Sequence, residues 1–258
     1  MSKRPATEIE ESVTKYTKSE VPNDPKSVLA ADDEIAIIYQ NKKYKFDPRN
    51  LQYSSPIQNK MSKSIDLTYL LKLESGKICE LKNFTLQTDV CESKFGLSIW
   101  DKTLPKKYSV DISFPGDSAI AKQMDAFDEA NAKALKANGT SWYGKRQDDV
   151  PKLSKMVSRR VKRNDPSVEY PPSIKFKIPV REDKKTGDLL SDVGVFDESG
   201  KRMPNGISDL HGARNSKIRV QFKHNSLWLL SSAVYSTLQA KQIQIIELGK
   251  DTNSFGFV

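Results

Sequence analysis

The chain has 258 residues, of which 37% are hydrophobic and 29% are charged, and its formal net charge is +9 at pH 7. No apolar run approaches the roughly 20 residues that span a bilayer, and the polar first residues lack the apolar core of a signal peptide. The two cysteines are too few for a disulfide framework. We therefore expect an intracellular protein, in the cytoplasm, the nucleus or the viral factory of a host, with no membrane partner.

The chain begins with a polar segment and continues as a series of strands. Residues 1–32 combine charged and hydroxyl side chains with few apolar ones, which predicts a mobile tail. The alternation of apolar and polar residues over 108–114 indicates a half-buried strand. Other strand-like runs lie at 35–46, where a hairpin is expected, and at 65–73, 78–86 and 95–100.

A change of pattern after Pro115 predicts helix. Asp117 or Ser118 can cap a helix, because a side-chain oxygen accepts from free backbone N–H groups of the first turn. Apolar residues then recur at helical spacing, at Ile120, Met124, Phe127 and Leu135. Gly139 is a typical helix end. A second helix is predicted over 152–163, so the helical insertion covers about 117–165.

Strand patterns return after Pro171 and Pro172, over 174–178, 193–196, 217–223 and 238–248. The apolar segment 226–236 contains Trp228, which we expect in the core. The strands do not alternate with helices, so a parallel sheet is not favoured. We predict a mainly β (α+β) fold, an oligonucleotide-binding-type antiparallel barrel with a helical insertion. The single barrel domain covers 33–250, and 251–258 forms a C-terminal tail.

Positive charge is concentrated between Trp142 and Arg181, where 11 Lys/Arg face 4 Asp/Glu, a net charge of +7. Exposed rings beside cations are typical of single-strand binding, because cations contact phosphates and rings stack on bases. The candidate binding residues are Trp142, Tyr143, Lys145, Arg146, Lys155, Arg159, Arg160, Arg163, Lys175, Lys177 and Arg219. Two plainer interpretations stay open: packing of the two rings in the core, and a basic helix that faces water.

An enzymatic alternative rests on Asp66, Glu80 and Lys82, spaced D-x13-E-x-K. In a metal-dependent nuclease, two carboxylates hold Mg²⁺ and a lysine lies beside the attacking water. The cysteines and histidines, Cys79, Cys91, His211 and His224, lack the close pairing of a zinc site. No P-loop, GxGxxG, GxSxG or HExxH motif is present. We therefore predict no catalysis, no metal and no cofactor.

A resemblance is carried by Tyr170–Lys177, by Val195-Phe196-Asp197, and by Lys217–Val220 leading into Leu227–Leu229. This pattern, over roughly residues 94–248, is similar to the single-stranded DNA-binding proteins of large nucleocytoplasmic DNA viruses, and more distantly to those of some phages. The resemblance implies an oligonucleotide-binding barrel without catalysis that coats exposed strands in replication, recombination or repair. Phage relatives end in an acidic tail that contacts replication proteins, whereas residues 251–258 here contain one acid.

The sequence thus predicts a binding protein for single-stranded nucleic acid, DNA rather than RNA, with little base preference. Replication proteins are possible further partners. The alternative from another class is a virion structural protein, a minor capsid or scaffold component, whose basic face contacts acidic protein or packaged genome.

Overall fold

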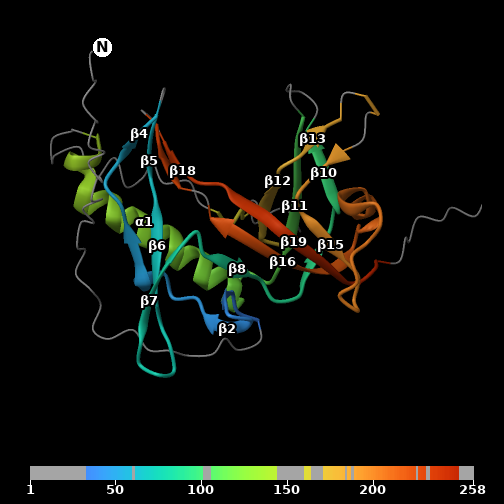
Figure 1. Ribbon diagram of the computed structural model, residues 1–258, viewed down its shortest axis with the longest axis horizontal. Coiled ribbons are helices and arrows are strands. Elements are labelled where there is room, and N and C mark those ends of the chain that lie inside the picture. Colours follow the sequence, from blue (N-terminus) through green and yellow to red (C-terminus); the bar gives the residue numbers. More distant parts are fainter. Residues whose placement is uncertain are drawn as a thin grey trace, which may run out of the picture.

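Figure 1 shows the computed structural model, which describes residues 33–59, 62–100, 106–143, 160–163, 171–183, 185–186, 189–224, 226–230 and 233–249. The two tails predicted at 1–32 and 251–258 lie outside the described residues. No helix in the described part of the chain is long and apolar enough to cross a membrane.

The centre of the molecule is a closed barrel of five strands, the first of which is interrupted and consists of two segments. In chain order these are β8 with β9 (Thr85–Gln87 and Cys91–Ser93), β11 (Lys107–Ser113), β12 (Ser173–Ile178), β16 (Ser216–His224) and β19 (Leu238–Glu247). Around the barrel, β9 pairs with β11, β11 with β12, β12 with β19, β19 with β16, and β16 with β9 again. Of these five barrel pairs, β12–β19 is the parallel one, and the other four are antiparallel. This five-stranded barrel confirms the predicted oligonucleotide-binding type.

Alternation along each strand explains why the barrel forms. Inward positions of β11 and β12 are fully or nearly fully buried apolar residues, among them Val110 and Phe176, whereas outward positions are polar. Opposite Phe176, the ring of Phe222 on β16 lies 4.8 Å away between ring centres. Because side chains of a strand alternate between faces, this pattern fixes which face of each strand forms the core.

The first barrel strand is interrupted between β8 and β9. At this interruption, Thr88 bonds to Val220 of β16 outside the regular strand pairing. The Thr88 backbone N–H donates to the Val220 carbonyl at 3.0 Å, and the Val220 N–H donates to the Thr88 hydroxyl oxygen at 3.1 Å. The side chain therefore satisfies a buried backbone donor on β16 and lets the strand bend without losing its pairing with β16 on either side of the bend.

Short elements extend the barrel and cover its sides. The hairpin of β1 (Ala36–Tyr39) and β2 (Lys42–Lys45) pairs with β8 and turns at Gln40 and Asn41, which have φ of 48° and 61°. Elements paired to the barrel or following it are β10 (Leu97–Trp100), β13 (Arg181–Glu182), β14 (Leu189–Leu190), β15 (Gly194–Phe196) and the 3-10 helix η3 (Gly206–Gly212). Beside the barrel lie η1 (Pro48–Asn50), the sheet of β3 (Leu51–Tyr53), β6 (Leu67–Lys72) and β7 (Ile78–Lys82), and the sheet of β4 (Ile57–Gln58), β5 (Lys63–Ile65), β17 (Leu227–Leu229) and β18 (Val234–Tyr235).

The helix α1 (Ala119–Tyr143) is the insertion between β11 and β12. Ser118 caps it, because its hydroxyl oxygen accepts from the Ala121 N–H at 3.2 Å. Gly139 does not end the helix as predicted: it is buried within α1, and the helix continues to its last buried residue, Trp142. The second predicted helix is corrected at its end, because Lys162 forms an isolated bridge with Ser173. Residues 152–159 lie outside the described part.

We expect Thr88→Val to lower the free energy of unfolding by about 1–3 kcal/mol, because the buried Val220 N–H loses its acceptor while side-chain volume is kept. Thr88→Ser retains the hydroxyl and is the control, with a smaller loss. Urea denaturation of the three proteins measures the difference. Equal losses in both variants would show that the methyl group, not the hydrogen bond, matters at this bend.

Candidate nucleic-acid interface

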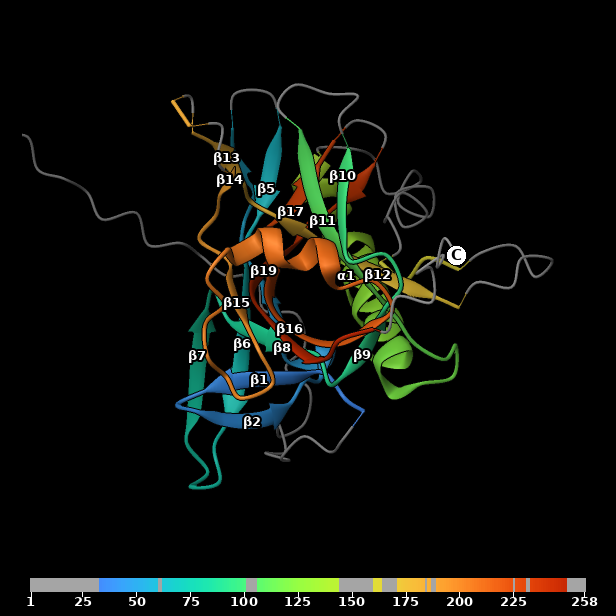
Figure 2. The same ribbon diagram turned by 90° about the vertical axis from the view of Figure 1, so that its right-hand side faces the viewer.

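Two connections of the barrel lie at the same end. The β9–β11 connection (94–106) leads into Tyr108, which pairs with Ile178 at the end of β12. The β16–β19 connection (225–237) leads into β19, whose residue Gln239 pairs in parallel with Lys177 of β12. Both views of the molecule accordingly show β10, β11 and β5, the partner strand of β17, at the upper end (Figures 1 and 2). In oligonucleotide-binding folds, these two connections and the second and third strands contact the ligand.

The outer face of β10, β11 and β12 is flat, polar and basic. Ser98, Ser109 and Lys177 form one row across the three strands. Beyond them, Trp100 pairs with Lys107 at the rim, and the Trp100 side chain is 54% exposed. The short serine side chains leave room for an extended polymer on this face. The bases of such a polymer can stack on the exposed ring, and its phosphates can contact the two exposed lysines.

The next row on this face is an ion pair. Lys175 Nζ lies 3.8 Å from an Asp111 carboxylate oxygen. Burial raises the pKa of Asp111, and the neighbouring Lys175 and Lys162 oppose that rise. Lys175 therefore contributes less net charge to a ligand than Lys177, although both lie on the face as predicted.

The β16–β19 connection carries a second exposed ring. Trp228 on β17 pairs with Tyr235 on β18, and Tyr235 is 39% exposed. Trp228 is only half-buried, not a core residue as expected, and lines a cavity of about 410 Å³ with Lys223. Burial and the nearby Lys241 ammonium lower the pKa of Lys223. Two cations close together at the base of this connection favour an anionic ligand.

Trp142 and Tyr143, at the end of α1, were both predicted to contact a ligand. In the structure they instead support the β16–β19 connection. Trp142 is 0% exposed, so the prediction of an exposed indole is corrected; its ring packs 5.9 Å from that of Tyr53. Tyr143 is half-buried, and its hydroxyl donates to the Leu230 carbonyl oxygen at 2.8 Å. Lys63 Nζ donates to the Trp142 carbonyl oxygen at 3.2 Å, which satisfies an acceptor left free at the helix end.

Arg160 is buried, contrary to the prediction that it contacts phosphates. Its side chain is 5% exposed and forms an ion pair with Asp128 of α1, which is 0% exposed. One Nη also lies 2.6 Å from His224 Nε2, and the same nitrogen donates to the Ser236 hydroxyl. The Phe127 ring lies 4.3 Å below the guanidinium carbon.

This arrangement requires a neutral His224. Burial, together with the Arg160 guanidinium, lowers the pKa of His224 well below its usual range. His224 ends β16 and Ser236 lies two residues before the start of β19, so Arg160 holds both ends of the β16–β19 connection against α1.

The remaining predicted residues lie apart from this face. Arg163 forms an exposed ion pair with Asp125 at 2.5 Å. Arg219 lies on the outer wall of β16, 3.5 Å from an Asp89 carboxylate oxygen. The other four candidates, Lys145, Arg146, Lys155 and Arg159, lie outside the described residues. Among the candidates that the structure describes, Lys175 and Lys177 are therefore the two that lie together on the flat face.

The nuclease pattern is not assembled. Asp66 and Lys82 line the 410 Å³ cavity near Trp228, but Glu80 does not. In the β6–β7 ladder, Lys82 pairs with Thr68 and Glu80 with Leu70, so Glu80 lies four ladder positions from Asp66, about 13 Å at the usual rise of a strand. One metal ion cannot bridge carboxylates at that separation. In the described residues, no three His, Cys, Asp or Glu side chains are grouped to hold a metal.

Sequence reasoning missed Trp100, Lys107, Lys223, Tyr235 and Lys241. For Trp100 a signal existed: Ser98 and Trp100 share one strand face, and the sequence that follows is rich in lysine. Tyr235 and Lys241 carried no local signal, because the parallel pairing of β12 with β19 is what brings the β16–β19 connection to the same end of the barrel.

The protein is similar in structure to known proteins but matches none of them in the sequence comparisons. No protein-family model and no curated protein matches this sequence. Among solved structures, gp2.5, a single-stranded DNA-binding protein of bacteriophage T7, is 17% identical with a TM-score of 0.41, covering 66% of this chain and 96% of that one. The single-stranded DNA-binding protein of bacteriophage Enc34 is 10% identical with a TM-score of 0.43, covering 74% and 95%. The Enc34 protein in complex with single-stranded DNA has a TM-score of 0.41 at 10% identity, covering 76% and 96%.

We expect Arg160→Met to lower the free energy of unfolding by about 3–5 kcal/mol, because the Asp128 carboxylate stays buried without its partner. Arg163→Met, which removes an exposed ion pair, is the matched control and should cost less than about 1 kcal/mol. The double variant Asp128→Leu/Arg160→Met should recover part of the loss, since no buried charge remains. Chemical denaturation compares the variants. Similar small losses for Arg160→Met and Arg163→Met would contradict the assignment of Arg160 as a buried anchor.

Proposed function

We propose that this protein binds single-stranded DNA, with little base preference, across the end of the barrel formed by the β9–β11 and β16–β19 connections. The observation that carries the proposal is that each of the two connections carries an exposed ring, Trp100 on β10 and Tyr235 on β18, and that Trp100 pairs with Lys107 of β11. The rings supply stacking surfaces, and Lys107, Lys177 and Lys241 supply phosphate contacts.

Single strands suit this surface better than duplex. A ring can stack on a base only when that base is unstacked from its neighbours, which costs free energy in a duplex but little in a single strand. Next to Trp100, the outer face of β10 and β11 presents serine hydroxyls rather than a protruding helix or ribbon that could enter a major groove. Stacking and phosphate contacts read no sequence, which fits a protein that coats exposed strands during replication, recombination or repair inside a cell. The proposal includes no catalytic step.

We expect Trp100→Ala to weaken binding to an oligo-dT strand by about 1–3 kcal/mol, because a stacked base loses its ring. The exposed position of Trp100 predicts little change in thermal stability. Fluorescence anisotropy with labelled oligo-dT, the matched duplex and the RNA counterpart measures the preference. A loss of binding accompanied by a large drop in Tm would show that Trp100 is a structural residue.

We expect Lys107→Ala/Lys177→Ala to reduce the slope of log K against log salt by about 1.4, since each phosphate contact on a single strand contributes about 0.7. The control, Lys43→Ala/Lys136→Ala, removes the same charge from the exposed surfaces of β2 and α1 and should leave the slope nearly unchanged. Equal slopes for both double variants would remove the flat face from the interface. No binding of wild-type protein to any strand at low salt would refute the proposed function and favour an acidic protein partner.

A further inference from the structure

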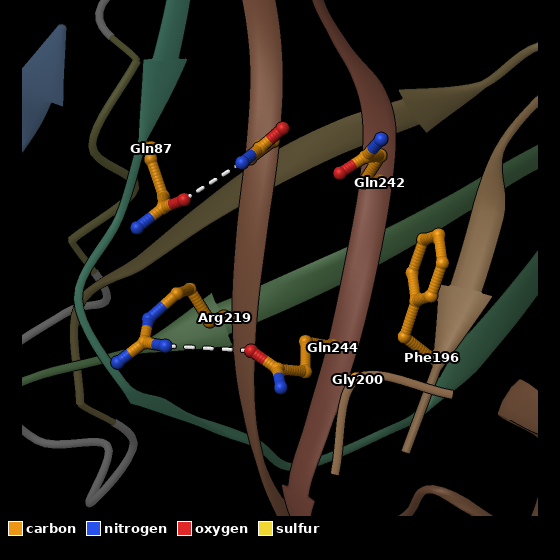
Figure 3. Close-up of a pocket in the computed structure, with 7 residues that line it drawn as sticks. Gln87, Phe196, Gly200, Arg219, Gln242 and Gln244 are labelled. Carbon is orange, nitrogen blue, oxygen red and sulfur yellow. Dashed lines mark hydrogen bonds between the residues drawn. The ribbon is translucent and has the colours of Figure 1, made fainter. Parts of the chain in front are cut away.

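The outer wall of the barrel carries a pocket of about 290 Å³ next to the proposed interface. It lies over β16 and β19, between β8 on one side and β15 with its following turn on the other (Figure 3). Its lining is dominated by side-chain amides, and its seven residues are Gln87, Phe196, Gly200, Arg219, Gln221, Gln242 and Gln244.

Two cross-strand rows build the pocket. In the first, Gln87, Gln221 and Gln242 lie side by side and end at Gly194 of β15. In the second row, Arg219 pairs with Gln244, which pairs with Phe196. The sheet pairing, which is set by the barrel, thus gathers these side chains from four strands on one face.

The absence of a side chain at Gly194 lets the Phe196 ring lie over the first row. A Cβ at Gly194 would approach the Phe196 ring to 2.6 Å, so only glycine allows this ring position. Figure 3 shows the ring beside Gln242 at the edge of the pocket. An aromatic ring next to an open amide offers both a stacking surface and a hydrogen-bonding edge.

Internal hydrogen bonds hold most of the lining in place. Gln221 Nε2 donates to Gln87 Oε1 at 2.8 Å, and Arg219 Nη1 donates to Gln244 Oε1 at 3.3 Å. Gln244 Nε2 donates to the carbonyl oxygens of Asp197 and Glu198 at 3.2 and 3.3 Å. Within the described part of the chain, the Gln242 amide makes no such bond and is exposed (Figure 3). The pocket therefore has a fixed frame and one amide ready to bond a ligand.

The charge in the pocket favours a neutral polar ligand over an anion. The Arg219 guanidinium is paired with Asp89, and every other lining side chain is uncharged. Cations lie just outside instead: Lys223 follows Gln221 by two residues on the same face of β16, and Lys241 precedes Gln242 on β19. A neutral planar group that is attached to a phosphate matches this arrangement, which is the chemistry of a nucleotide.

We propose that the amide pocket holds one nucleobase of the bound single strand, stacked against Phe196 and hydrogen-bonded by Gln242, while Lys223 and Lys241 contact its phosphate. This inference rests on the proposed function and extends the interface from the barrel end onto the wall of β16 and β19. Because an amide both donates and accepts, it bonds the edge of any base. The pocket thus adds affinity without imposing a sequence.

The test moves a single abasic site one position at a time along an oligo-dT strand and measures the affinity of wild-type protein and variants. In the wild type, removing the one base that lies in the pocket should weaken binding by about 5- to 150-fold. This is the range expected when one stacked base is lost. That sensitivity should disappear in Gln242→Leu and in Phe196→Leu and persist in Trp100→Ala. Gln52→Leu on β3, a glutamine far from the pocket, is the matched control.

The outcomes separate this inference from the proposed function. Binding of oligo-dT with an abasic profile that Gln242→Leu and Phe196→Leu leave unchanged would overturn the pocket while keeping the interface. Absence of any strand binding would overturn both. A free nucleotide has the same chemistry as a nucleotide of the strand, so thymidine monophosphate is tested alone as the alternative ligand. If the mononucleotide binds the wild type but not Gln242→Leu while the abasic profile is unaffected, the pocket takes free nucleotides and the strand-bound proposal is wrong.

Discussion

One buried guanidinium fixes the geometry of the binding end. Arg160 lies among Asp128 of α1, His224 at the end of β16 and Ser236 before β19, with Phe127 against its face. A buried arginine is tolerated only where its charge is paired, and the Asp128 carboxylate is that partner here. Both ends of the β16–β19 connection are therefore tied to the helical insertion, and the Tyr143 hydroxyl adds a third tie at Leu230. The position of the exposed Tyr235 depends on these internal contacts.

The closed barrel brings two connections that are far apart in the sequence to the same end of the molecule. Because β12 and β19 run parallel, the connection after β16 returns to the end where β10 rises (Figure 1). Two exposed rings that are far apart in sequence thus lie on connections at one end of the barrel. The same pairing places β15 beside β19 and assembles the amide pocket on the adjoining wall. The proposed interface thus combines stacking at the barrel end and phosphate contacts at the rim with a base pocket on the wall of β16 and β19.

The sequence predicted the fold better than the site. Strict alternation over 108–114 and 174–178 identified barrel strands, because one face of each must be buried. Exposure of individual side chains could not be predicted in the same way. Trp142 and Arg160 looked like ligand contacts beside other cations, yet one packs against Tyr53 and the other pairs with Asp128 across 32 residues. Such partners meet only through tertiary packing, and no local pattern reveals them.

The most direct test of the interface is ultraviolet cross-linking of the full chain to oligo-dT, followed by mass spectrometry of the cross-linked peptides. We expect adducts on the two peptides that contain Trp100 and Tyr235, and we expect these adducts to be lost when unlabelled single strand competes but not when duplex competes. The β3–β6–β7 sheet, on the side of the barrel, should give none. Efficient cross-linking that spares both rings and concentrates on that sheet would contradict the placement of the binding surface at this end.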